Sequence, residues 1–259
     1  MEIKKIAVRG GHTEKATGAS ALIDELTEDR KVKDAVIKYL RKLGYEVLDV
    51  TPPVNYTSNA STDLSYGVNK ANEWGADLFV SIHFNKAYDS YNGALGSEVC
   101  VYSEHEIAQR VVNTLGALGF KNRGQKVRTN LYELKNTKMK AMIVETCFVE
   151  ATEDVALYNK LGYDKVGQTI AEAISNKKVT ATTSTVTSTT TNAAQTSTTN
   201  YKVKITASAL NVRKGAGTNY SIATTVKKNE VYTIVEEKNG WGKLKSGAGW
   251  ISLSYASRI

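Results

Sequence analysis

The segment ADLFVSIHFN, residues 76–85, is a short apolar run that ends in a histidine and an asparagine. Runs of this length and composition are typical of strands buried on both faces of a parallel sheet. Open α/β sheets present their functional groups at the carboxyl ends of such strands. The segment therefore predicts an α/β fold, and it places His83 at the edge of the sheet where a site would lie.

A second strand with the same ending is found in residues 1–12, MEIKKIAVRGGH. Gly10 and Gly11 leave the backbone without side chains, so His12 is delivered to the crevice beyond the sheet edge. The sequence contains three histidines, and two of them follow strands in this way. We therefore expect His12 and His83 to lie close together.

Two imidazoles are an incomplete ligand set for a catalytic zinc ion, which commonly has two His, one Glu and an open position. The helix predicted at residues 24–43 opens with four acids that could complete the set: Asp24, Glu25, Glu28 and Asp29. On a helical wheel, Glu25 lies about 20° from the apolar positions Val32 and Val36, so it points toward the sheet. Glu28, at about 40° and 80° from them, is the alternative ligand. The helix dipole alone would account for Glu28 and Asp29 in a first turn.

A fourth candidate lies in residues 141–150, AMIVETCFVE, which form another apolar strand. A carboxylate inside such a strand is costly unless it is paired. Beside a metal it would be ready to exchange protons with water. Glu145 is therefore the candidate general base.

Strand-like and helix-like patterns alternate through residues 1–175. We expect strands at 3–8, 45–50, 78–84, 98–102 and 142–146, and helices at 24–43, 64–74, 104–118 and 164–175. This alternation predicts an α/β catalytic domain with a largely parallel sheet flanked by helices.

The composition changes twice in the remainder of the chain. In residues 176–200, 14 of 25 residues are Thr or Ser and none is aromatic, which predicts a flexible linker. Residues 201–259 consist of short runs of period two, with turn signals at residues 239–240 and 246–249. They predict a small all-β barrel.

The net charge of +8 belongs to the tail, because residues 201–259 contain ten Lys or Arg and three Asp or Glu. Such a module favours a polyanion: nucleic acid, an anionic membrane or an acidic wall polymer. No apolar stretch approaches the roughly 20 residues that cross a bilayer, and no signal-peptide pattern opens the sequence. We expect Cys100 and Cys147 to be buried reduced thiols and His105 to be a solvated surface residue.

Four motifs in residues 1–175 resemble the zinc-dependent N-acetylmuramoyl-L-alanine amidases of phage endolysins and bacterial autolysins. They are RGGH (9–12), IDE (23–25), SIHFN (81–85) and IVETCF (143–148), with GSEV (96–99) and NRG (122–124) in addition. The tail is similar to bacterial SH3-like wall-binding domains through ALNVRKGAGTNYSI (209–222), GW (240–241) and GWI (249–251).

The resemblance implies hydrolysis of the amide between the lactyl group of N-acetylmuramic acid and L-alanine in peptidoglycan. In that reading Zn²⁺ is held by His12, Glu25 and His83, and Glu145 moves a proton from water to the departing nitrogen. Residues 201–259 would then bind bacterial peptidoglycan and associated wall polymers, with no nucleic acid as partner and no insertion into a membrane.

Other classes of function stay open. A zinc peptidase or a deacetylase could act on the same cell wall, and a non-catalytic wall-binding or nucleic-acid-binding protein could rely on the basic tail. The non-catalytic alternative leaves the histidines and glutamates unexplained. Without a signal peptide, a phage endolysin that stays in the host cytoplasm until lysis is favoured over a secreted autolysin.

Overall fold

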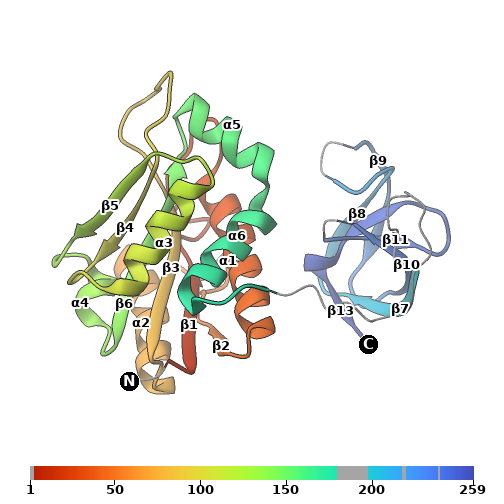
Figure 1. Ribbon diagram of the computed structural model, residues 1–259. Helices are drawn as coiled ribbons and strands as arrows, with labels where there is room; N and C mark the ends of the chain where they lie inside the picture. Colours follow the sequence, from red (N-terminus) through yellow and green to blue (C-terminus); the bar gives the residue numbers. More distant parts are fainter. Residues whose placement is uncertain (1–2, 180–197, 218–219, 239) are drawn as a thin grey trace, which may run out of the picture. The chain divides into compact units, whose positions relative to one another are not determined.

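The computed structural model describes residues 3–179, 198–217, 220–238 and 240–259. The chain divides into two compact units, residues 1–182 and 183–259 (Figure 1). The first unit is an α/β domain, and the second is an all-β domain.

The first unit is built on a six-stranded, mostly parallel sheet in the order β2-β1-β3-β6-β4-β5. Its strands are β1 (Lys5–Gly10), β2 (Glu46–Asp49), β3 (Leu78–Asn85), β4 (Ser97–Val101), β5 (Asn122–Val127) and β6 (Lys140–Phe148). The pairs β1–β2, β1–β3, β3–β6 and β4–β5 are parallel, whereas β4 and β6 are antiparallel. The prediction of a largely parallel sheet is confirmed.

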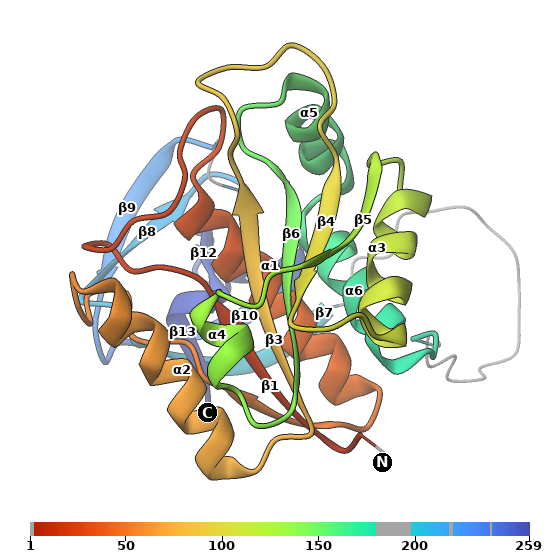
Figure 2. The ribbon, with the colours of Figure 1, turned by 90° about the vertical axis from the view of Figure 1, so that its left-hand side faces the viewer.

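Helices cover both faces of this sheet (Figures 1 and 2). They are α1 (Glu25–Lys42), α2 (Ala60–Trp74), α3 (Glu106–Ala117), α4 (Tyr132–Asn136), α5 (Thr152–Leu161) and α6 (Tyr163–Ser175). The helices α1, α3 and α6 pack on one face, and α2 and α4 lie on the other. Within the described ranges, none of the helices has the length and hydropathy needed to cross a bilayer.

The two faces of the sheet differ toward the carboxyl ends of β1, β3 and β6. On the face toward α1, residues such as Val8 and Ile82 are fully buried in the larger core. Alternation along the strands turns Arg9, His83 and Glu145 to the opposite face. That face is apolar under α2 and α4, and it becomes polar where the three parallel strands end. The polar end of this face is where the candidate site forms.

Helix α1 brings a further side chain to the same edge. Asp24 caps it, because its carboxylate accepts a hydrogen bond from Thr27 N at 2.9 Å. Val32 and Val36 bury the helix against the sheet, and Gly44, with φ of 90°, follows its last turn. Since the loop from β1 leads directly into α1, the first turn of the helix lies at the carboxyl edge of the strands.

Three elements of the first unit were not expected from the sequence: β5, α4 and α5. β5 (NRGQKV) lies at the edge of the sheet and is partly exposed, so it lacks the apolar alternation that marks a strand. α4 contains only five residues, too few for a helical period. α2 also begins earlier than expected, at Ala60, because Asn59 accepts a hydrogen bond from Thr62 N and caps it.

The second unit is an antiparallel sheet in the order β13-β7-β10-β11-β12-β8-β9. Its strands are β7 (Thr198–Ile205), β8 (Ala209–Arg213), β9 (Ile222–Lys227), β10 (Val231–Lys238), β11 (Trp241–Leu244), β12 (Trp250–Ser252) and β13 (Ala256–Arg258), with a 3₁₀ turn at Leu253–Tyr255. Its buried residues, among them Val212, Ile234 and Ile251, form a core of their own. The predicted all-β tail is therefore confirmed.

Most of the linker expected at residues 176–200 falls on residues 180–197, outside the described part of the chain. At its start, Val179 N donates to Glu172 Oε1 at 3.1 Å, and the Lys178 ammonium pairs with the same carboxylate. At its end, β7 already begins at Thr198, which pairs with Glu236 of β10.

The sequence also led to expectations for the two cysteines and for His105. Cys100 and Cys147 are buried free thiols, as expected. The expectation that His105 is a solvated surface residue is wrong, because it is half-buried and caps α3. Its Nδ1 accepts a hydrogen bond from Ala108 N at 3.2 Å, and burial lowers its pKa.

The closest approach of α1 and α6 depends on Gly167. A Cβ at this position would overlap the Cβ of Ala35 and lie 2.9 Å from Val32 O. We expect Gly167→Ala to lower the free energy of unfolding by about 1–3 kcal/mol, because the helices must separate. The exposed Lys165→Ala on the same helix should change it by less than about 0.5 kcal/mol. Chemical denaturation of both variants measures this, and equal stabilities would contradict the packing.

Candidate metal centre

The loop after β1 holds His12 in an unusual backbone conformation. Its φ is 58°, in the left-handed region that residues other than glycine seldom adopt. The Arg30 guanidinium donates a hydrogen bond to His12 O and fixes this peptide. The preceding Gly11 packs against the His83 ring, which a Cβ at that position would overlap. Residues 11 and 12 thus bring the two rings together at the cost of a strained backbone.

Glu25, the first residue of α1, is oriented by backbone groups from two other segments. Its Oε1 accepts a hydrogen bond from Phe84 N at 3.0 Å, and its Oε2 accepts one from Ala19 N at 2.6 Å. Gly18 leaves room for the carboxylate, because a Cβ there would overlap both Glu25 and His12. The carboxylate is therefore fixed before any ligand binds.

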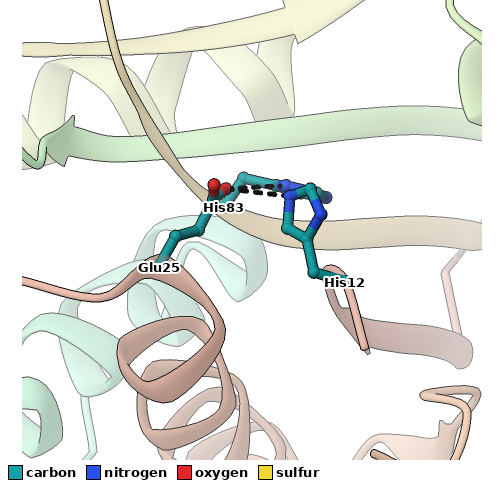
Figure 3. Close-up of side chains that lie close together, drawn as sticks. All are labelled: His12, Glu25 and His83. Carbon is teal, nitrogen blue, oxygen red and sulfur yellow. Dashed lines mark hydrogen bonds and ion pairs between the residues drawn. The ribbon is translucent and has the colours of Figure 1, made fainter. Parts of the chain in front are cut away.

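His12, Glu25 and His83 converge at the carboxyl edge of the sheet (Figure 3). Glu25 Oε1 lies 3.3 Å from His12 Nε2 and 3.1 Å from His83 Nδ1. The two imidazole rings meet edge to face, with their centroids 5.0 Å apart. One donor atom from each residue lies within 4.8 Å of the other two, a spacing that a single metal ion could bridge.

The charge distribution of this cluster favours a cation. Burial opposes ionisation of Glu25, but hydrogen bonds from His12 and His83 lower its pKa well below the usual range. Burial also disfavours a charged His83, yet the contact with Glu25 raises the pKa of His83 to about 9. A position that retains a proton this strongly has a negative potential, so it would also attract a metal ion.

The donor set fits zinc in both chemistry and accessibility. Two imidazole nitrogens and one carboxylate oxygen are a common protein ligand set of catalytic zinc ions, which keep a further position open. The side chain of His12 is 28% exposed, whereas that of Glu25 is 5% exposed. The site is therefore fixed on its inner side and open to a substrate on its outer side.

Glu145 lies beside this cluster, on β6 in register with His83 of β3. It is half-buried, and its Oε2 is a buried oxygen without a hydrogen-bond partner among the described residues. Burial raises the pKa of Glu145 to about 7, and the nearby carboxylates of Glu25 and Glu98 contribute in the same direction. A carboxyl group with this pKa can both accept and release a proton near neutral pH.

The other acids of the α1 N-terminus are not part of this cluster. Glu28 lies outside the cluster, and its carboxylate pairs with Lys31 at 2.7 Å and accepts a hydrogen bond from Tyr158 OH at 2.8 Å. The expectation that the helix dipole alone accounts for Asp29 is wrong, because its side chain is fully buried. That burial raises its pKa well above the usual range.

Sequence reasoning missed a second group of buried polar residues, Arg9, Asp63, Ser81 and Glu133. The sequence did contain a sign of this group, because Arg9 and Ser81 lie inside strands that are otherwise apolar. Glu133 could not be placed, because the short helix α4 that carries it was not predicted.

Glu98 of the GSEV motif and Arg123 of the NRG motif form an ion pair next to Glu145. Glu98 of β4 is paired with Glu145 across the antiparallel strands, and its Oε2 lies 2.7 Å from Arg123 Nε. Asn85 Nδ2 donates to the other oxygen of Glu98 at 3.2 Å. These contacts hold the carboxylate of Glu98, which is nearly buried, in a fixed position beside Glu145.

Comparison with known proteins agrees with this architecture. The family described as N-acetylmuramoyl-L-alanine amidase matches residues 6–176, and the family described as bacterial SH3 domain matches residues 208–257. The catalytic domain of the CD27L endolysin, described as targeting Clostridia Difficile, has a TM-score of 0.62 and 29% identity. That match covers 68% of this chain and 99% of the domain.

Two relatives extend the comparison at the level of sequence. An uncharacterised protein of Clostridium perfringens (strain 13) is 51% identical over 180 residues, 68% of this chain and 52% of the relative. This chain thus spans about half the length of that relative. The N-acetylmuramoyl-L-alanine amidase CwlM of Bacillus licheniformis is 31% identical over 179 residues, 66% of each chain.

The fold of the first unit is that of an amidase catalytic domain, and the second unit is a bacterial SH3 domain. The chain belongs to the N-acetylmuramoyl-L-alanine amidase family.

Two glutamates one turn apart on α1 test the donor set. We expect Glu25→Gln to weaken zinc binding by at least about a hundredfold. This is more than is usually lost when a residue that only hydrogen-bonds to a metal ligand is removed. Glu28→Gln should bind zinc as the unmodified protein does, because Glu28 points to Tyr158 and Lys31. Competition with a chromogenic chelator measures both affinities. The opposite order of effects would make Glu28 the ligand.

Proposed function

We propose that this protein hydrolyses the amide bond between N-acetylmuramic acid and L-alanine in peptidoglycan, using Zn²⁺ bound by His12, Glu25 and His83. The observation that carries the proposal is the convergence of these three side chains, from separate elements, at the open edge of an amidase-family sheet. The family supports the choice of bond, and the donor set supports the choice of metal.

The chemistry divides between the metal and the protein. A zinc ion bound at this site would supply a Lewis acid that activates water and polarises an amide carbonyl. The protein keeps Glu25 ionised and oriented through Phe84 N and Ala19 N. It also leaves His12 accessible, so the scissile amide can approach from the outer side.

Glu145 carries the proton in this proposal. It accepts the proton of the attacking water and returns it to the nitrogen of the departing alanine. An amine leaves poorly unless it is protonated, so the second transfer is as necessary as the first. Burial of Glu145 beside the carboxylates of Glu25 and Glu98 suits this role, because it raises the proton affinity of the base.

Residues 201–259 would bind the substrate surface. Their net charge of +7 complements acidic wall polymers, and they form the bacterial SH3 domain. Binding to the wall raises the local concentration of substrate for the first unit and leaves the chemistry of the first unit unchanged.

Glu145→Gln tests the catalytic role. We expect kcat on isolated cell walls to fall by about 10²–10⁴-fold, because the glutamine side chain cannot accept a proton from water. Zinc content and the circular dichroism spectrum should stay unchanged. Glu106→Gln, a fully surface position on α3, serves as the matched control. Full activity of Glu145→Gln would remove this residue from the mechanism.

The nature of the released group distinguishes the proposed reaction from the alternatives. Incubation with isolated cell walls should expose new L-alanine amines without new reducing sugars, and a chelator should stop the release until zinc is restored. Release of acetate would identify a deacetylase, and a new amine within the peptide would identify a peptidase. Either result would overturn the proposed substrate bond.

Removal of residues 180–259 tests the role of the second unit. We expect binding to isolated walls to weaken by at least about tenfold, with the largest loss at low salt, where charge attraction is least screened. Cleavage of a soluble muramyl peptide should be unaffected. Co-sedimentation and product analysis measure the two properties, and an equal loss of both would contradict a pure targeting role.

A further inference from the structure

A chain of buried polar groups leads away from His83 on the side opposite to Glu25. His83 Nδ1 faces Glu25, and His83 Nε2 lies 3.0 Å from Ser81 Oγ. The Ser81 hydroxyl in turn donates to Glu133 Oε1 at 3.4 Å. A second oxygen of Glu133 lies 3.9 Å from His83 Nε2. One nitrogen of the ring thus faces the candidate metal centre, and the other faces this polar chain.

Arg9 closes the chain deeper in the protein. Its guanidinium pairs with Glu133 Oε1 and with Asp63 Oδ2, each at 2.7 Å. The side chains of Arg9, Asp63 and Glu133 are 0%, 5% and 2% exposed. Helix α2 accommodates the arginine through Gly67, where a Cβ would lie 3.0 Å from Arg9 Cδ. Four elements, β1, α2, β3 and α4, therefore contribute to one buried network.

A buried network of this kind contributes little to the free energy of unfolding. Burial of three charges costs several kcal/mol of desolvation per ion, and well-packed apolar residues often replace such groups without loss. At most 5% of any of these three side chains is exposed, so solvent recovers little of this cost. The polar chain ends on the His83 ring, one of the candidate metal ligands.

We propose that Ser81, Glu133 and Arg9 position His83 as a metal ligand by fixing its tautomer. The ring donates Nε2–H to Ser81 Oγ, and the Ser81 hydroxyl donates to Glu133, which Arg9 holds in place. In the zinc-loaded protein Nδ1 then carries no proton, and its lone pair is available to the metal on the side of Glu25 and His12. These are positioning residues, and the inference rests on the proposed zinc function.

The single proton of the Ser81 hydroxyl determines which group donates and which accepts along this chain. A serine hydroxyl has one proton to donate, and its oxygen can accept another. Since an ionised Glu133 is only an acceptor, the Ser81 proton points to Glu133, and Ser81 Oγ remains free to accept from His83. The other tautomer would place a proton on Nδ1, where a metal ion could not bind. Partners of this kind change metal affinity by about 10–100-fold in other proteins.

Ser81→Ala removes the central link with little change in volume. We expect the dissociation constant for zinc, measured by chelator competition on the full chain, to rise about 10–100-fold. The matched control is Ser175→Ala, another buried serine, whose hydroxyl donates only to backbone carbonyls of α6 and its C-terminal end. It should bind zinc as tightly as the unmodified protein, and thermal unfolding of both variants shows that each is folded.

Nitrogen-15 NMR shows which nitrogen of the His83 ring carries the proton. A loss of stability alone would not change that tautomer. In the zinc-loaded protein we expect His83 to carry its proton on Nε2, and in Ser81→Ala we expect that proton signal to broaden or vanish. Glu133→Gln should weaken zinc binding as well. The double variant should bind no more weakly than the weaker single variant, because both act through one chain.

The outcomes separate this inference from the proposed function. Equal zinc affinities of Ser81→Ala and the unmodified protein, a proton on His83 Nδ1 in the zinc-loaded state, or additive effects in the double variant would overturn the positioning role alone. Failure of the unmodified protein to bind zinc would overturn both.

Discussion

The contact of the Glu25 carboxylate with the imidazoles of His12 and His83 is the interaction on which the site depends. These residues lie on a loop, a helix and a strand, and each is held by backbone constraints of its own. Glu25 receives two backbone N–H groups, and His12 sits in a left-handed conformation that Arg30 stabilises. The fold therefore concentrates negative potential and two imidazole nitrogens at one point, which is a requirement for binding a divalent cation.

The sheet explains why this point lies where it does. The parallel strands β1, β3 and β6 end at the same edge, and their alternation separates a fully apolar face from a face whose last residues are polar. His83 and Glu145 are neighbours because β3 and β6 are in register, so the proposed ligand and the proposed base are brought together by backbone pairing alone. Helix α1 adds Glu25 from the other face through its first turn. One sheet edge thus combines groups that are up to 133 residues apart in the sequence, from His12 to Glu145.

Much of this arrangement could be predicted from the sequence, and the remainder has identifiable physical reasons. Strand ends marked His12 and His83, and helical periodicity distinguished Glu25 from Glu28, because burial on a helix follows a regular angle. Periodicity could not identify β5, an exposed edge strand, or α4, a single turn, so Glu133 and its contact with Ser81 were missed. His105 was misjudged because its role as a helix cap depends on local backbone geometry, and Asp29 because its neighbours come from distant segments.

The central claim is that three side chains from separate elements share one zinc ion. Crystals of the full chain grown with zinc and measured on both sides of the zinc absorption edge test it most directly. We predict one strong anomalous peak at about 2.0–2.2 Å from a nitrogen of His12, a nitrogen of His83 and an oxygen of Glu25. A peak at other residues, or no peak at saturating zinc with the two imidazoles turned apart, would contradict the account.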